Sequence, residues 1–254
     1  MSKRFVRLGF ILQKRYFKFQ AAILLAVCCC APVFAGVFTV TPVRIFMSPT
    51  DRAVAVTVTN EGDTELVMQA DLYLWKQKPD GQDDLTLTED IFLSPPIIKL
   101  APKSRQVVRL ARLSTAKPTE QLSYRMIVRE IPVPKADARD LQLQIALAFS
   151  MPVFITPFTA KAKLDCSASR ATADAIKVTC ENSGSAYAHP TALQLTAVAG
   201  DKIASQETGG YLLPGIKRSF DLKKADGKIP SGKAKLVATL ADGTTLTYDV
   251  AIGD

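Results

Sequence analysis

Apolar and polar residues alternate over short stretches of this chain, and the alternation predicts β-strands. Residues 53–60, AVAVTVTN, alternate with a period of two and end at a turn signal, Asn60-Glu61-Gly62-Asp63. The same pattern predicts further strands in this half of the chain over 65–76, 105–113, 122–131 and 141–155. No stretch has a clear helical period, so we expect an all-β fold built as a sandwich.

The pattern changes near Thr156-Pro157-Phe158. Beyond this point the predicted strands are shorter and richer in Ala, Gly and Lys, and they cover 161–166, 175–181, 191–198, 210–213, 218–222, 234–240 and 244–252. Each set of strands suits a domain of about 100 residues with its own core. We therefore expect an N-terminal domain over 36–156 and a C-terminal domain over 157–254.

The first 35 residues predict an export signal, a segment that is absent from the mature protein. Residues 1–20 contain six basic residues and no acidic one, and the apolar run that follows ends in the cleavage pattern Val33-Phe34-Ala35. The whole chain has 32 basic and 24 acidic residues, whereas the part after residue 35 has 26 and 24, a net charge of +2. The high charge therefore belongs mostly to the signal, and no basic stripe remains for a nucleic acid.

Two cysteines, Cys166 and Cys180, remain after the signal, and both lie in the second half of the chain. An even pair in an oxidising compartment predicts one disulfide bond. Two buried free thiols are the alternative.

One segment has a longer alternation than any other. From residue 141 to 151 every odd position is large and apolar, and every even position is small or polar; the odd positions are Leu141, Leu143, Ile145, Leu147, Phe149 and Met151. Successive side chains of a strand point to opposite faces, so one face of this strand is an unbroken apolar row. The row can cover the core of its own sandwich, or it can be donated to an incomplete sandwich in a partner protein.

The order and spacing of several segments resemble those of the PapD-like periplasmic chaperones of the chaperone–usher pathway. The segments are TVTPVRIF, VTVTNEGD, SPPIIKLAPKSRQVVRL, YRMIVREIP, LQIALAFSMPVFITP and CENSGSAYAHP. The resemblance implies two immunoglobulin-like β-sandwich domains in a boomerang arrangement. It also implies a periplasmic protein that binds, folds and caps pilus or fimbrial subunits by donor-strand complementation, and delivers them to an outer-membrane usher.

The resemblance assigns roles to particular residues. The arginine that binds the subunit's C-terminal carboxylate in the family corresponds to Arg44, and a guanidinium suits this task because its two parallel N–H donors match a carboxylate. A solvated strand arginine is the alternative reading of Arg44. The donor positions of the family correspond to Leu141, Leu143, Ile145 and Leu147.

Three positions depart from the family's pattern. Pro152 replaces the second cleft cation, a lysine, while Thr156 and Gln121 replace the arginine and the glutamate of the interdomain ion pair. These departures indicate a divergent branch of the family, archaic or spore-coat-like. Candidates for the missing positive charge are Arg109, Arg125 and Arg129.

The residues argue against an enzyme. The single histidine, His189, would have to serve any Ser-His-Asp triad or histidine metal site, and it lies next to Pro190 in an expected loop. The chain has no phosphate loop, dinucleotide fingerprint or CxxC motif, so we expect no cofactor, metal or small-molecule substrate. The alternative to a chaperone is a structural pilus component or a two-domain Ig-like adhesin, which would need a free N-terminal donor extension and one incomplete domain.

Overall fold

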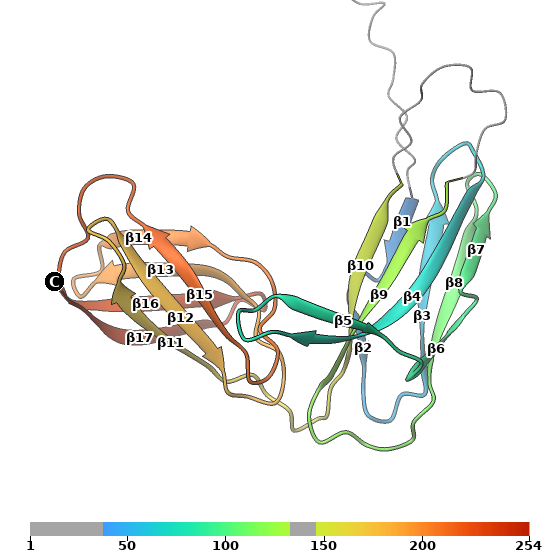
Figure 1. The fold of residues 1–254 in the computed structure, drawn as a ribbon, viewed down its shortest axis with the longest axis horizontal. Helices are drawn as coiled ribbons and strands as arrows, with labels where there is room; N and C mark the ends of the chain where they lie inside the picture. Colours follow the sequence, from blue (N-terminus) through green and yellow to red (C-terminus); the bar gives the residue numbers. More distant parts are fainter. Residues whose placement is uncertain (1–37, 133–145, 254) are drawn as a thin grey trace, which may run out of the picture. The chain divides into compact units, whose positions relative to one another are not determined.

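The computed structural model describes residues 38–132 and 146–253, and every regular element in these ranges is a β-strand (Figure 1). The residues from Phe38 onward form one compact unit. The expected all-β fold class is confirmed. Because the described ranges hold no helix, they also hold none that could cross a membrane. The expected signal, residues 1–35, lies outside the described residues.

The first sandwich consists of two sheets that share one core. The first sheet is antiparallel and has the order β1 (Phe38–Thr41), β3 (Ala53–Asn60), β8 (Arg105–Arg112), β6 (Ile91–Ser94). The second sheet has the order β2 (Ile45–Met47), β10 (Ala148–Ile155), β9 (Leu122–Glu130), β4 (Leu66–Gln77), β5 (Asp83–Leu87), and β7 (Ile97–Leu100) pairs with β4 as well. β2 and β10 run parallel to each other.

The alternation of side chains explains how this core forms. On β3, Val56 and Val58 are fully buried, and on β9 Met126 and Val128 are fully buried, while the residues between them are less buried. The two sheets therefore bury their apolar rows against each other, as the strand period of two requires.

The second sandwich is smaller and is built in the same way. One sheet has the order β11 (Leu164–Arg170), β12 (Ala175–Asn182), β15 (Lys217–Lys223). The other has the order β14 (Lys202–Glu207), β13 (Pro190–Ala197), β16 (Gly232–Leu240), β17 (Thr245–Ile252). Its core includes Ile176, Val178, Leu193, Leu195 and Leu236, which have no exposed surface.

The structure confirms most of the expected strands, and it corrects others. The segment 210–213 is not a strand: Leu212 makes only an isolated bridge with Ala188, and its apolar neighbours pack into a side-chain cluster instead. The strand expected over 161–166 begins only at Leu164. The strands that were not expected are very short, as are β1, β2, β6 and β7, or mostly exposed, as are β5 and β14, so they have no clear apolar alternation.

No strand of either sandwich crosses from one to the other in the described ranges, and the sheets change over between Ile155 and Leu164. The domain limits of 36–156 and 157–254 are finer than this observation and stay a prediction.

Candidate partner-binding site

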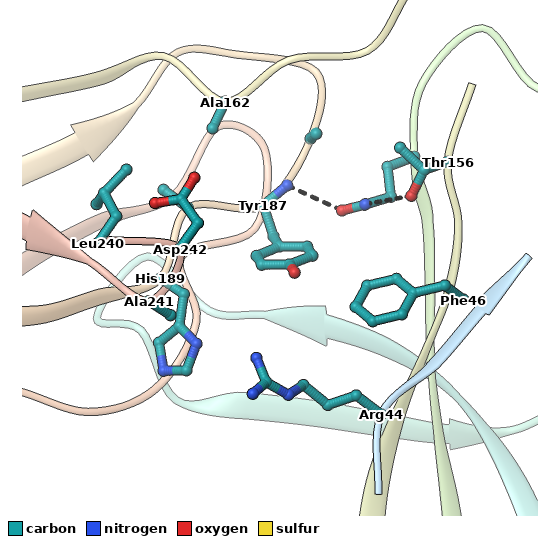
Figure 2. Close-up of a pocket in the computed structure, with 12 residues that line it drawn as sticks. Arg44, Phe46, Thr156, Ala162, Tyr187, His189, Leu240, Ala241 and Asp242 are labelled. Atoms are coloured by element: carbon teal, nitrogen blue, oxygen red, sulfur yellow. Dashed lines mark hydrogen bonds between the residues drawn. The ribbon is translucent and has the colours of Figure 1, made fainter. Parts of the chain in front are cut away.

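A pocket of about 450 Å³ lies beside Arg44, where residues of both sandwiches meet (Figure 2). Arg44 is exposed and directly precedes β2, and Phe46 on β2 is also exposed. The second sandwich contributes Tyr187, His189 and Asp242. The rest of the wall is mostly small and apolar, and consists of Ala162, Ala186, Ala188, Leu240 and Ala241, with Gln121 and Thr156. The pocket thus offers one guanidinium in a largely apolar surround.

Gln121 connects the two sandwiches at the edge of this pocket (Figure 2). Its Nε2 donates a hydrogen bond to Thr156 Oγ1 at 2.6 Å, and its Oε1 accepts one from the Tyr187 backbone N–H at 2.8 Å. The positions of the expected interdomain ion pair therefore do contact each other, but through a neutral bond. A neutral amide has no charge for salt to screen, and it does not titrate.

A second glutamine makes a similar connection. Gln77, at the end of β4, donates from Nε2 to the Tyr211 carbonyl at 2.9 Å and accepts from the Leu213 N–H at 3.0 Å. Between the two glutamines lies a buried cluster in which Phe154 stacks on Tyr187, with ring centroids 4.3 Å apart, and Trp75 packs edge-on against Tyr211. Sequence patterns did not single out Gln77 or the aromatic cluster, because an apolar or amide side chain on a strand carries no signal of what it will touch.

Two of the three candidate secondary cations are engaged elsewhere. The guanidinium of Arg125 lies 3.8 Å from the centre of the Trp75 ring and pairs with Asp83 at 3.3 Å. Arg129 pairs with Asp71 at 3.3 Å and donates to the Tyr73 hydroxyl at 3.0 Å.

The third candidate, Arg109, lies on β8 in the other sheet, opposite Ala55 and Ser94. None of the three candidates is among the described residues that line the Arg44 pocket. Their role as secondary anchors stays a prediction, and the geometry of this pocket gives it no support.

The apolar row changes its surroundings along β10. Of the expected donor residues, Leu141, Leu143 and Ile145 lie outside the described residues, and Leu147 is described. Leu147 is 37% exposed and Phe149 is 38% exposed, although Met151, the next residue of the same row, is only 2% exposed. The row is therefore part of the protein's own core from Met151 onward and leaves that core toward Leu147.

The backbone of β10 changes at the same place. β9 pairs with β10 from Ala148 to Ile155, whereas β2 pairs with β10 only from Val153 to Ile155. The stretch 148–152 therefore has no strand partner on its second edge among the residues that the structure describes. Phe38 of β1 reaches this stretch through its side chain, with a ring centroid 4.8 Å from that of Phe149, and not through a ladder.

Two hydrogen bonds show which backbone groups of β10 face the open edge, which is the edge of residues 148–152 that no described strand pairs with. The Leu147 carbonyl accepts from the Glu130 N–H on the β9 side, and the Thr156 N–H donates to the Met47 carbonyl on the β2 side. Because successive residues of a strand point their backbone groups to opposite edges, the N–H groups of Ala148 and Ser150 face the open edge. Pro152 is the next residue in this series, and it has no N–H to offer.

The two cysteines of the second sandwich form a disulfide bond. Cys166 on β11 and Cys180 on β12 lie directly opposite each other, with Cα atoms 4.1 Å apart. The expected pairing is therefore found. The same ranges hold no group of three or more metal-ligating side chains.

Comparison with known proteins identifies the fold and the family. Residues 37–161 match the family described as pili and flagellar-assembly chaperone, PapD N-terminal domain. No curated protein sequence matches the chain.

Several solved structures are similar over most of the chain. A chain of the CsuC–CsuE chaperone–tip adhesion subunit complex, from archaic Csu pili of Acinetobacter baumannii, has a TM-score of 0.62 and 20% identity over 86% of this chain and 100% of that one. The E. coli chaperone DraB has a TM-score of 0.55 and 17% identity over 86% of this chain and 97% of its own. A chain of the Salmonella enterica complex of SafA pilin with the SafB chaperone has a TM-score of 0.55 and 14% identity over 86% of this chain and 98% of its own.

At these identities the structural likeness defines the class of fold, which is the two-sandwich, immunoglobulin-like fold of these chaperones. The match over residues 37–161 assigns the chain to a family within this class: it belongs to the PapD-like pili and flagellar-assembly chaperones.

Proposed function

We propose that this protein is a periplasmic chaperone that binds and caps pilus subunits by lending them the strand that leads into β10. The subunit would add its own strands along the open edge at 148–152 and would cover the apolar row that begins at Leu141. Relatives support the kind of partner, because the similar structures include a chaperone with a tip adhesion subunit and a chaperone with a pilin.

The observation that carries this proposal is the exposure of Leu147 and Phe149 beside an edge with no strand partner in the described ranges. An exposed apolar strand with free backbone donors is a template for pairing with another chain, and natural proteins usually protect such edges. A chaperone that must receive a strand-deficient partner has a use for both features. The family match favours this function over a structural pilus component or an adhesin.

The apolar row can supply a free energy of the same size as the cost of association. Each large apolar side chain that is fully buried contributes about 1.5–3 kcal/mol. The four donor residues would together exceed the cost of association at the low end of its range, about 4–15 kcal/mol. The backbone bonds of the added strand contribute mainly register and orientation.

Arg44 is the proposed anchor for the subunit's terminal carboxylate. It precedes Ile45, which pairs with Val153, so it lies level with the point at which the open edge ends. Its side chain lines a mainly apolar pocket, where a charge-assisted bond to a carboxylate is stronger than at an open surface.

The remaining parts of the proposal concern the setting. We place the protein in the periplasm because the disulfide bond suits an oxidising compartment and because of the family. Delivery to an outer-membrane usher and membership of an archaic-like branch are proposed on the same grounds, together with the neutral Gln121–Thr156 bond. Binding and release by strand exchange need no catalytic group, so we assign the chain no enzymatic activity.

Amide hydrogen exchange of the protein alone and in complex with a co-expressed pilus subunit tests the strand addition at single residues. The N–H groups of Ala148 and Ser150 should become protected in the complex, because they face the open edge. The N–H groups of Phe149 and Met151 already face β9 and should change little. Equal protection at odd and even positions, or none, would contradict strand addition at this edge.

Arg44→Ala tests the anchor separately. Truncating one partner of a desolvated ion pair costs about 2–5 kcal/mol, so subunit recovery from the periplasm should fall sharply while the variant stays folded. Arg52→Ala, an exposed arginine that does not line the pocket, is the matched control. Equal recovery with both variants would place the anchor elsewhere.

A further inference from the structure

His189 is the single histidine of the chain, and it lines the same pocket as Arg44. Its ring lies against Tyr211, with centroids 4.3 Å apart, and Figure 2 shows the guanidinium of Arg44 extending toward the imidazole. The Nδ1 atom of His189 is buried and has no hydrogen-bond partner among the residues that the structure describes. A polar atom left in this state lacks a group that would satisfy it.

The surroundings of His189 keep its ring neutral in the free protein. Burial, and to a lesser degree the positive charge of Arg44, lower the pKa of His189 below its usual value, so the ring is neutral near pH 7. Tyr211 packs on the ring and Tyr187 lines the same pocket; burial raises the pKa of Tyr187, which is therefore neutral too. Asp242 is the one acidic residue of the lining, and its carboxylate is held by the Thr244 backbone N–H at 2.9 Å.

A carboxylate bound beside Arg44 would favour the protonated form of His189. Its negative charge would offset the repulsion from Arg44, and its oxygen would accept a hydrogen bond from the ring. A neutral imidazole has one N–H donor, whereas an imidazolium has two, so an anion at this point favours the protonated ring. Arg44 is the one lysine or arginine in the described lining, so a second positive charge has to come from a group of another kind.

Resting on the function proposed above, we propose that His189 is the second ligand of the partner's terminal carboxylate, and that it takes up one proton from solvent when the carboxylate binds. The site then has one permanent cation and one that forms only with the ligand. The proton raises the charge of the ring from zero to plus one, which balances the carboxylate. The pocket stays less charged when it is empty than a site with two permanent cations.

The sign of the pH dependence follows from this linkage. Binding raises the pKa of His189, so the complex holds more protons than the free protein between the two pKa values. Affinity therefore increases as the pH falls through that window, by up to tenfold per pH unit. The increase ends where His189 is protonated in the free protein as well, and affinity falls again near pH 4, where carboxylates themselves become protonated.

A single histidine makes the test direct. The untagged protein without residues 1–35 is titrated by NMR, with the ring signals of His189 followed from pH 4.5 to 8 at constant ionic strength, in chloride, in acetate and in acetamide. Acetate should raise the titration midpoint of His189, acetamide should not, and Arg44→Ala should weaken the acetate effect. An unchanged midpoint in acetate would overturn the inference.

Subunit binding separates this inference from the function on which it rests. With a co-purified pilus subunit, the wild type should bind more tightly at pH 5.5 than at pH 7.5, whereas His189→Gln, which cannot take up a proton there, should show no such change. His189→Phe keeps the ring on Tyr211 and serves as the control for packing. Arg44-dependent binding with the same pH profile in wild type and His189→Gln would refute the role of His189 alone. Absence of any subunit binding in the wild type would refute the proposed function itself.

Discussion

β10 has two halves with the same alternation of residues and different surroundings. In the closed half, from Val153 to Ile155, the strand is paired on both edges, by β2 and β9, and its side chains are buried. In the open half, from Ala148 to Ser150, it is paired by β9 alone among the described strands, and its side chains are exposed. The comparison teaches that exposure along β10 follows the coverage by the rest of the protein and not the alternation of the residues. Under the proposed function, a partner chain supplies to the open half the coverage that β2 and the core supply to the closed half.

Met151→Asp should have the largest effect, because at Met151 the apolar row is already core although β2 does not pair with this residue. Met151 has almost no contact with solvent and lies among the apolar residues of the first core. An unpaired buried charge should cost about 4 kcal/mol or more of the free energy of unfolding. Thermal unfolding of the purified variant checks this. A melting temperature close to that of the wild type would show that the row is not core at Met151.

Phe154→Ala should have the next largest effect. Phe154 is fully buried and packs on Tyr187, Trp75 and Tyr211, so removal of its ring should cost about 3–5 kcal/mol in urea unfolding. If Phe154→Ala costs less than about 1 kcal/mol, the cluster that joins the sandwiches contributes little.

Gln121→Ala tests the connection at the end of the closed half. It removes both the bond to Thr156 and the acceptor of the Tyr187 N–H, and it should cost about 1–3 kcal/mol. Thr156→Val removes only the first of these bonds and should cost about 1 kcal/mol. Both losses should be the same at low and high salt, measured by urea unfolding, because neither group is charged. A strong salt dependence would show that an ion pair acts here instead.

Phe149→Ala should have the smallest effect on stability. It removes the same ring as Phe154→Ala, but from the open half, where its one aromatic contact within the described ranges is with Phe38. The loss should be about 1 kcal/mol, while subunit binding should weaken clearly. A loss equal to that of Phe154→Ala would remove the distinction between the two halves.

The sequence predicted the strands and the row better than it predicted their surroundings. Alternation marks Phe149 and Met151 in the same way, because it reports which face a side chain is on and not whether that face is covered. Coverage depends on where β1 and β2 end, and those strands are too short to be recognised from their pattern. Likewise, the exchange of charged residues for Gln121 and Thr156 predicted the loss of an ion pair, but only the structure reveals the hydrogen bond that replaces it.

In the candidate site, too, residue types could be predicted from the sequence, but contacts between residues far apart in the chain could not. Arg44 was found through the resemblance, and the disulfide through the even number of cysteines, because both rest on residue type. The sequence points to His189 only as a possible catalytic or metal-binding group, because its neighbours Tyr211 and Arg44 are distant in sequence. Arg125 was considered a candidate anchor, although its position over Trp75 and its pairing with Asp83 could not be deduced from a strand pattern.

The most direct test of strand donation compares Leu147→Asp with Ser150→Asp, a control that places the same charge on the exposed opposite face of the strand. Both variants are assayed for melting temperature and for the ability to protect a co-expressed pilus subunit from periplasmic proteolysis. We predict that both melt within about 2 °C of the wild type, because substitutions at exposed positions change stability by about 0.5 kcal/mol or less. We also predict that only Leu147→Asp loses protection of the subunit. A collapsed melting temperature for Leu147→Asp, or full protection of the subunit by it, would contradict the account.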